Sequence, residues 1–399
     1  MTHRILCDPA ARTPADHPAS VKPTIPPTTY SIPELKTFAA CQRMHGFRYG
    51  ERLKPRDPGF HRTLAIAVRR ALAVYYKTAD LVSALDEIDR ALGGSPYEAE
   101  LRDLAHGMLV GYADWSLPHD GFAVLGVEVP FACRVRTPSG RRSAKDALAG
   151  VSDLLVRRED GSLWLVRHKT AQSLGENLAQ KLKADFSLRA DWWAMSEFLG
   201  EALAGVLVNV LRTKLPTIPK RNQCPSCKGT GTKGGATCPA CGGSGLGGLS
   251  KRVDIDTTVE VFTGEILRFG LNHDEYRDIL DSLALRETNG NHPFFARVEL
   301  RFEEEERAEI GREIYQLARN VRTCRCPCRN TSACSLYGSC DYWDLCFGSR
   351  MDQTELERRF ERLPDPHPEF AGIDLAGRLD EAGTALRRLT AGSGGGGVR

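Results

Sequence analysis

A repeated pair of cysteines in a glycine-rich stretch constrains this chain more than any other feature. Cys224-Pro-Ser-Cys227-Lys-Gly-Thr-Gly231 recurs fourteen residues later as Cys238-Pro-Ala-Cys241-Gly-Gly-Ser-Gly245. Each half places two thiolates on one tight turn, where glycines let backbone amides approach the sulfurs. Two such turns make a closed tetrahedral site of four sulfurs, which suits a structural zinc ion. We therefore predict a zinc knuckle whose ligands are Cys224, Cys227, Cys238 and Cys241.

The repeat resembles the CxxCxGxG units of the DnaJ cysteine-rich region. An insert this rich in glycine, residues 221–248, has almost no core of its own. Zinc binding would then supply most of its folding free energy, on the order of 10 kcal/mol. A redox pair or plain loop cysteines are the alternatives to zinc. The pattern favours a structural clip, with contact to DNA as the alternative role.

Length and composition limit the class of protein. The 399 residues suffice for two domains, or for one large domain with insertions, and 41% apolar residues can bury a sizeable core. A net charge of only +3 means that any nucleic-acid site must be a local patch. Ten of the thirteen cysteines cluster at ligand spacing in a long chain, which favours metals over disulfides. With no long apolar run, we expect a cytoplasmic protein (in the host cytoplasm if viral) without a membrane partner.

Periodicity predicts an α/β core between two less regular ends. Residues 1–29 are predicted to be a disordered arm, and 347–399 a C-terminal extension ending in a Gly-rich tail. The capping box Ser31-Ile-Pro-Glu34 opens a predicted helix over 31–49. Further predicted helices cover 60–77, 79–92, 96–115, 185–200, 256–269, 273–285 and 303–321. Predicted strands cover 121–136, 148–158, 162–170, 205–212 and 294–302.

One strand pair carries a family resemblance. Gly150-Val-Ser-Asp153, followed after a turn by Arg167-His-Lys169, resembles the core of the PD-(D/E)XK nucleases. In that family an Asp ends one strand, and a Glu or Asp and a Lys lie two apart on the next. Residues i and i+2 share a face, so two carboxylates hold Mg²⁺ or Mn²⁺ while the lysine faces the phosphate. The resemblance implies a restriction-endonuclease-like α/β fold with Asp153 and Lys169 as catalytic residues.

Other motifs resemble the RecB-type branch, which includes CRISPR-associated iron–sulfur exonucleases and phage relatives. They are Ser31 to Cys41, Asn209 to Pro216, Leu249 to Arg252 with Asp256-Thr-Thr, and Asn330 to Cys346. The resemblance implies a RecB-type nuclease-like domain over 30–346, with a helical N-terminal part, the insert and a cysteine cluster at 324–346. It also implies a [4Fe–4S] cluster that staples the two ends together through Cys41, Cys334, Cys340 and Cys346. A second zinc site is the alternative, and Cys324, Cys326 and Cys328 are competing ligands.

The expected active site is degenerate. Arg167 stands at the usual Glu position, Arg69 where a His belongs, and Arg189 at a Gln position. If Glu159-Asp160-Gly161 forms a three-residue loop, Asp153 faces Arg167 and a salt bridge can replace the metal. A two-residue turn would instead place Asp153 opposite His168. The candidates for restoring a metal ligand are Glu128, Glu176, His168 and His61.

Two functions follow from this resemblance. One is a metal-dependent DNA exonuclease or endonuclease; the other is a catalytically inactive DNA-binding protein with a basic cleft. In the second, Arg69, Arg167, Lys169 and Arg189 would bind phosphates, and Trp192 or Trp193 would stack a base. The expected partners are DNA, single-stranded or at ends, and recombination or replication proteins.

Overall fold

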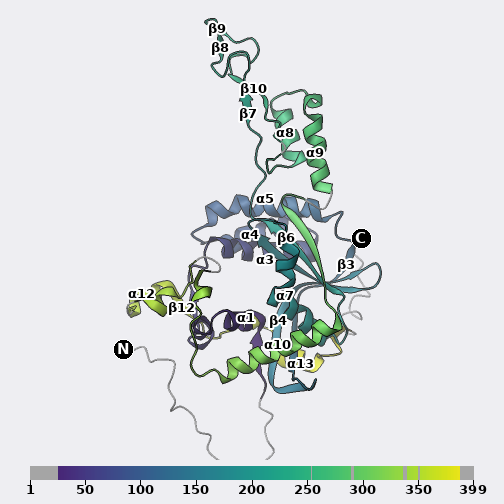
Figure 1. Ribbon diagram of the computed structural model, residues 1–399, viewed down its shortest axis with the longest axis vertical. Helices are drawn as coiled ribbons and strands as arrows, with labels where there is room; N and C mark the ends of the chain where they lie inside the picture. Colours follow the sequence, from purple (N-terminus) through teal and green to yellow (C-terminus); the bar gives the residue numbers. More distant parts are fainter. Residues whose placement is uncertain (1–25, 253, 289–291, 336–338, 349–350, 387–399) are drawn as a thin grey trace, which may run out of the picture.

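A mixed β-sheet lies at the centre of the protein in the computed structural model (Figure 1). The structure describes residues 26–252, 254–288, 292–335, 339–348 and 351–386. The sheet is built from β1 (Thr28–Ser31), β3 (Phe122–Arg136), β4 (Arg142–Arg158), β5 (Leu163–Ala171), β6 (Gly205–Arg212) and β11 (Phe295–Arg301). Its order is β1-β4-β5-β6-β11, and β3 pairs with β4.

The central strands are buried on both faces. The β4–β5 and β6–β11 pairs are antiparallel, whereas β1–β4 and β5–β6 are parallel. Because side chains alternate along a strand, Leu155 and Leu165 enter one core cluster while Val156 and Val166 enter another on the opposite face. Such strands read as continuous apolar runs.

Helices cover both faces of the sheet (Figure 1). On one side lie α3 (Phe60–Thr78), α4 (Leu81–Leu92) and α5 (Glu98–Ser116); on the other lie α1 (Ile32–Ala40), α7 (Phe186–Leu199) and α10 (Glu304–Thr323). The short α6 (Leu178–Lys183) precedes α7. The predicted α/β class is confirmed, and α3, α4, α5, α7 and α10 each lie within a few residues of their predicted ranges.

The first helix departs from its prediction. Ser31 caps α1 as expected, its Oγ accepting from the Glu34 amide at 3.2 Å. The helix then stops at Cys41, whose backbone is extended, and resumes as α2 (Gln42–His45) and a π-helical turn, Gly46–Gly50. Two residues of the predicted disordered arm, 28 and 29, lie in a strand instead, because Thr28–Ser31 pairs with β4; residues 1–25 lie outside the described residues.

The predicted insert, 221–248, is part of a unit that also includes two helices. The unit contains β7 (Arg221–Gln223), β8 (Thr232–Lys233), β9 (Ala236–Thr237), β10 (Leu246–Leu249), α8 (Val259–Arg268) and α9 (Arg277–Thr288). Leu249 and Phe262 belong to a small core that this unit makes for itself. The unit, which we call the arm (residues 214–288), projects away from the sheet and its helices (Figure 1).

The C-terminal extension folds back onto the domain. After α11 (Trp343–Phe347), it contains α12 (Gln353–Arg359), β12 (Phe360–Arg362) and α13 (Leu375–Glu381). β12 pairs with β2 (Leu53–Pro55), and the Gly383 amide donates to the Phe198 carbonyl at 2.8 Å. The predicted Gly-rich tail lies outside the described residues. No helix in the described ranges has the length and apolarity needed to cross a membrane.

Replacing Gly205 with alanine should destabilise the protein by about 1–3 kcal/mol. A Cβ there would lie 2.1 Å from the Leu300 carbonyl oxygen and 2.7 Å from the Trp164 ring, so the β5–β6–β11 contact must shift. Gly264→Ala is the matched control, because that helical glycine faces open space; it should be neutral or stabilise by up to about 1 kcal/mol. Urea unfolding midpoints of the two variants test this, and equal midpoints would contradict it.

Candidate active site

The turn between β4 and β5 sets the register of the site. The Arg158 amide donates to the Ser162 carbonyl at 3.0 Å, and Gly161 adopts a φ of 82°. Leu154 pairs with Val166, so the loop is the three-residue form. Asp153 and Arg167 consequently lie beside each other, as that form of the loop predicts.

Arg167 lies between two buried carboxylates. Its Nη1 is 3.3 Å from Asp153 Oδ1, and its Nε is 3.3 Å from Asp191 Oδ2 on α7. The same Nη1 donates to the Val151 carbonyl at 3.1 Å. Only 17% of the Arg167 side chain is exposed, against 9% and 5% for the two acids. A protein cation therefore occupies the space between the two carboxylates.

The two acids differ in pKa. Burial raises the pKa of Asp191 to about 6, although Arg167 opposes the shift. Burial also acts on Asp153, but Arg167, His168 and the His168 amide, which donates to Oδ2 at 2.9 Å, together hold its pKa below the usual range. Asp153 is thus the carboxylate that Arg167 mainly stabilises.

Lys169 is also bound by an acid. Its Nζ lies 2.7 Å from Asp185 Oδ2, while Lys36 Nζ lies 3.2 Å from the other oxygen. Asp185 is the N-cap of α7 and accepts from the Ser187 amide at 2.8 Å. Burial acts to raise the pKa of Asp185, but Lys169 and Lys36 outweigh it and hold the pKa far below the usual range. The predicted catalytic lysine reaches the site in an ion pair.

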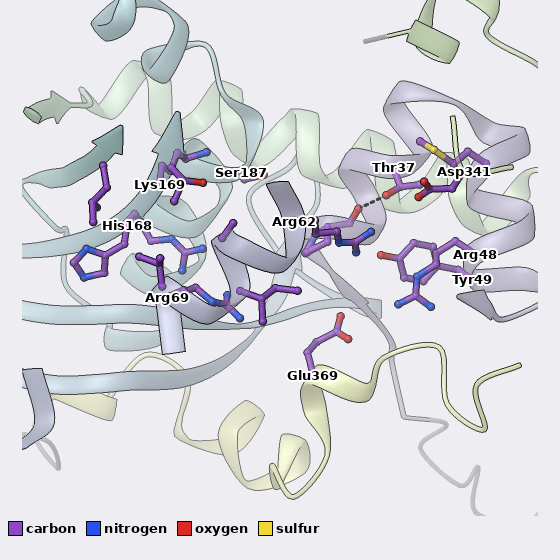
Figure 2. A pocket seen from close by; sticks show the side chains of 18 of the residues that line it. Thr37, Arg48, Tyr49, Arg62, Arg69, His168, Lys169, Ser187, Asp341 and Glu369 are labelled. Atoms are coloured by element: carbon purple, nitrogen blue, oxygen red, sulfur yellow. Dashed lines mark hydrogen bonds between the residues drawn. The ribbon is translucent and has the colours of Figure 1, made fainter. Parts of the chain in front are cut away.

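A cavity of about 700 Å³ opens in front of these residues (Figure 2). Its charged lining is mainly basic: Arg48, Arg62, Arg69, Arg167 and Lys169, against Asp341 and Glu369. Within the described part of the chain, Arg62 and Arg69 make no ion pair or hydrogen bond, and Arg48 Nη1 is buried without a hydrogen-bond partner. Several cationic groups thus remain available to an anionic ligand.

A second cavity, of about 310 Å³, contains the acids. Asp153, Asp191 and Glu128 line it together with Arg69 and Arg167. Glu128 has a φ of 49° and lies between the pairs Val127–Leu154 and Val129–Ser152. Of the candidates for restoring a ligand, Glu128 therefore reaches the site.

The other candidates do not supply a ligand beside Asp153. His168 stacks on Tyr76 with ring centroids 5.5 Å apart, and burial lowers its pKa to about 4. Glu176 and His61 are exposed and line neither cavity.

Three residues predicted for the cleft lie elsewhere. Arg189 pairs with Glu313 of α10 at 2.9 Å and lines neither cavity. Trp192 and Trp193 are buried in the core, and the Trp192 indole donates to the Leu203 carbonyl at 2.9 Å, so neither can stack a base. Sequence reasoning missed Asp185 and Asp191. An aspartate within the apolar run Ala190-Asp-Trp-Trp-Ala-Met195 was a signal, because buried carboxylates need a partner.

The four cysteines of the knuckle converge. The Sγ atoms of Cys224, Cys227, Cys238 and Cys241 all lie within 4.8 Å of one another, and Cys227 and Cys241 are 3.7 Å apart. Tetrahedral zinc with Zn–S bonds of about 2.3 Å requires S···S separations of about 3.8 Å. The donor set therefore fits a single metal ion.

The four cysteines predicted to hold the [4Fe–4S] cluster also come together, but they lie farther apart than the four cysteines of the knuckle. Cys41, Cys334, Cys340 and Cys346 line one cavity of about 20 Å³, which Cys324 and Cys328 do not. Among the described residues, no three of them approach to within 4.8 Å. The two chain segments are joined by backbone contacts: the Arg43 amide donates to the Cys328 carbonyl at 3.0 Å.

Comparison with known proteins identifies the family of the chain. The family model of the PD-(D/E)XK nuclease superfamily matches residues 29–347, and the chain belongs to that superfamily. No curated protein matches the chain. Among solved structures, the crystal structure of SSO0001 matches with 17% sequence identity and a TM-score of 0.20, covering 45% of this chain and 70% of that chain.

Arg167→Ala should cost about 3–5 kcal/mol of stability at neutral pH, because it leaves two buried carboxylates without their cation. The loss raises both pKa values in the folded state. A carboxyl group whose pKa is higher in the folded than in the unfolded state lowers the stability of the protein at pH values above its folded-state pKa. This destabilisation disappears as the pH falls toward the pKa of the unfolded state. The penalty should therefore shrink from pH 8 to pH 5.

Arg69→Ala is the matched control, since that exposed side chain makes no ion pair among the described residues; it should cost less than about 1 kcal/mol. Urea unfolding at several pH values measures both. A pH-independent or negligible Arg167 penalty would contradict the ion-pair account.

Proposed function

We propose that this protein binds nucleic acid through a nuclease fold that no longer needs a catalytic metal ion. The observation that carries the proposal is Arg167, held between Asp153 and Asp191. The family implies a nucleic-acid substrate, and the basic cavity in front of Arg167 suits its phosphates.

The acidic site does not fit Mg²⁺. That ion demands near-octahedral oxygen ligands at about 2.1 Å and carboxylates to balance its charge. Here the Arg167 guanidinium already pairs with both Asp153 and Asp191, and a divalent cation about 4 Å from it would be repelled by about 8 kcal/mol at an effective dielectric of about 20. Lys169, the other predicted catalytic group, is bound to Asp185.

Binding would use the arginines of the cavity that make no ion pair among the described residues. Arg62 and Arg69 on α3 and Arg48 on the π-helical turn enter the cavity from different elements (Figure 2). Each can donate two hydrogen bonds to one phosphate, which lysine cannot do. By its motifs we assign the chain to the RecB-type branch, with DNA that is single-stranded or has free ends as the ligand. This role would involve recombination or replication proteins as partners, and we propose that the protein acts in the cytoplasm.

Two further metal centres belong to the proposal. The spacing of the knuckle sulfurs supports zinc at Cys224, Cys227, Cys238 and Cys241. The wider spacing of Cys41, Cys334, Cys340 and Cys346 favours a [4Fe–4S] cluster over one ion, because each thiolate then binds its own iron. Such a cluster would hold the N-terminal helices against the C-terminal segment.

The wild-type protein should bind single-stranded DNA without cleaving it, equally in EDTA, Mg²⁺ and Mn²⁺. Arg62→Gln/Arg69→Gln should weaken binding and lower the salt slope by about 0.7 per phosphate contact on a single strand. Arg141→Gln, an exposed arginine in the β3–β4 turn, is the control and should change neither. Fluorescence anisotropy and a gel assay on the same samples provide the two readouts.

Arg69→His/Arg167→Glu should create metal-dependent cleavage by restoring the family's ligand types. Wild-type cleavage that requires Mg²⁺ and disappears in Asp153→Ala would overturn the proposal in favour of an active nuclease. Failure of the wild type to bind any DNA would overturn it as well.

Metal analysis of anaerobically purified protein should find one zinc and about four irons per chain. Cys238→Ser should lose zinc and keep iron, and Cys346→Ser should do the reverse, so each variant controls for the other. Zinc at both sites, with no iron and no visible absorbance, would refute the cluster.

A further inference from the structure

The arm is divided into a basic part and an acidic part. Between Lys214 and Arg252 the chain has seven Lys and Arg and no Asp or Glu. From Asp254 to Thr288, where α8 and α9 lie, it has nine Asp and Glu and three Lys and Arg. A structural clip needs no such separation, whereas a surface that binds polyanions needs a region without carboxylates.

The internal repeat shows that one of these lysines is strained. Lys228 follows Cys227 with a φ of 53°, and at the same place in the second half Gly242 follows Cys241 with a φ of 57°. Left-handed backbone costs an L-residue about 1–2 kcal/mol, whereas glycine adopts it freely. Glycine thus fits this position of the turn without strain, yet the first half of the repeat has an exposed lysine there.

The side chains near this turn are not neutralised. Within the described residues, the Lys220 and Lys228 side chains make no ion pair or hydrogen bond, and Lys233 donates to a hydroxyl, that of Ser226, at 3.2 Å. By contrast, Lys214 at the base pairs with Asp256 at 2.6 Å, and Arg252 pairs with Asp254 at 2.5 Å. The positive charge that no acid neutralises among the described residues is therefore concentrated around the knuckle, at Lys220, Lys228 and Lys233.

The arm also starts at the cavity. Its first residues directly follow β6, and Leu211 of β6 lines the 700 Å³ cavity. In Figure 1 the arm extends from this end of the sheet, with β8 and β9 farthest away. A nucleic acid that runs from the cavity along the arm would meet this basic surface.

We propose that the knuckle is a second DNA-binding site, in which Lys220, Lys228 and Lys233 contact the phosphate backbone of a duplex that extends from the cavity. The inference rests on the proposed function of that cavity. It assigns Lys228 a role in binding that outweighs its backbone strain. Contacts of this kind carry no base specificity and depend strongly on salt.

The test compares the binding of two DNA probes to the full-length protein. The short probe is a single strand of about 8 nucleotides, which is enough for one compact site. The long probe is the same strand joined to a duplex of about 30 base pairs, each of which adds about 3.4 Å of length. Lys220→Gln/Lys228→Gly should leave affinity for the short strand unchanged. For the long probe it should weaken binding and lower the salt slope by about 1.8, or 0.9 per contact. Arg268→Gln/Arg277→Gln removes the same charge from α8 and α9 and should change neither.

Lys228→Gly alone separates binding from folding, because it relieves strain. It should retain zinc and stability while losing affinity for the long probe, and Lys228→Arg should restore that affinity. Unchanged affinity and salt slope in the lysine variants would overturn the inference, while the Arg62/Arg69 variant still tests the cavity. Wild-type protein that binds neither probe would overturn both.

Discussion

The contact of one guanidinium with two buried carboxylates links the three elements on which the site depends. Arg167 comes from β5, Asp153 from β4 and Asp191 from α7. Removing charges from water costs several kcal/mol per ion, and only close pairing with additional hydrogen bonds offsets it. Here the Val151 carbonyl and the His168 amide supply those bonds. The arrangement therefore fixes how α7 packs on the sheet.

The same arrangement explains how a nuclease fold can change its chemistry and keep its shape. A divalent ion between carboxylates holds strands and helix together and also activates water. A guanidinium retains the structural part of that role but supplies no water to activate. Lys169 follows the same logic, since Asp185 and Lys36 place it in a network at the start of α7. Under the proposed function, the cations that face the cavity would still recognise phosphate.

Local rules predicted five of the six strands of the sheet and most helices, and they limited the β4–β5 register to two alternatives, because turn chemistry and alternation act over a few residues. Hence Asp153, Arg167 and Lys169 could be placed from the sequence alone. Asp191 could not, because its contact depends on how α7 lies on the sheet. The prediction that Arg189 reaches the cleft was wrong for the same reason, because it assigned the wrong face of α7 to the cleft. At 100° per residue, positions 189 and 191 lie on nearly opposite sides of a helix, so Arg189 pairs with Glu313 on α10 instead.

The cavity and the C-terminal cysteines share a wall. Met44 and Tyr342 line both the 700 Å³ cavity and the small cavity between the four cysteines. Tyr342 also packs on Phe47 and Phe360, with its hydroxyl donating to the Leu53 carbonyl at 2.8 Å. Whatever holds the two ends of the chain together therefore also shapes the cavity on the side of Arg48. The C-terminal cysteines and Arg48 are therefore parts of one structural unit, although they lie almost three hundred residues apart in the sequence.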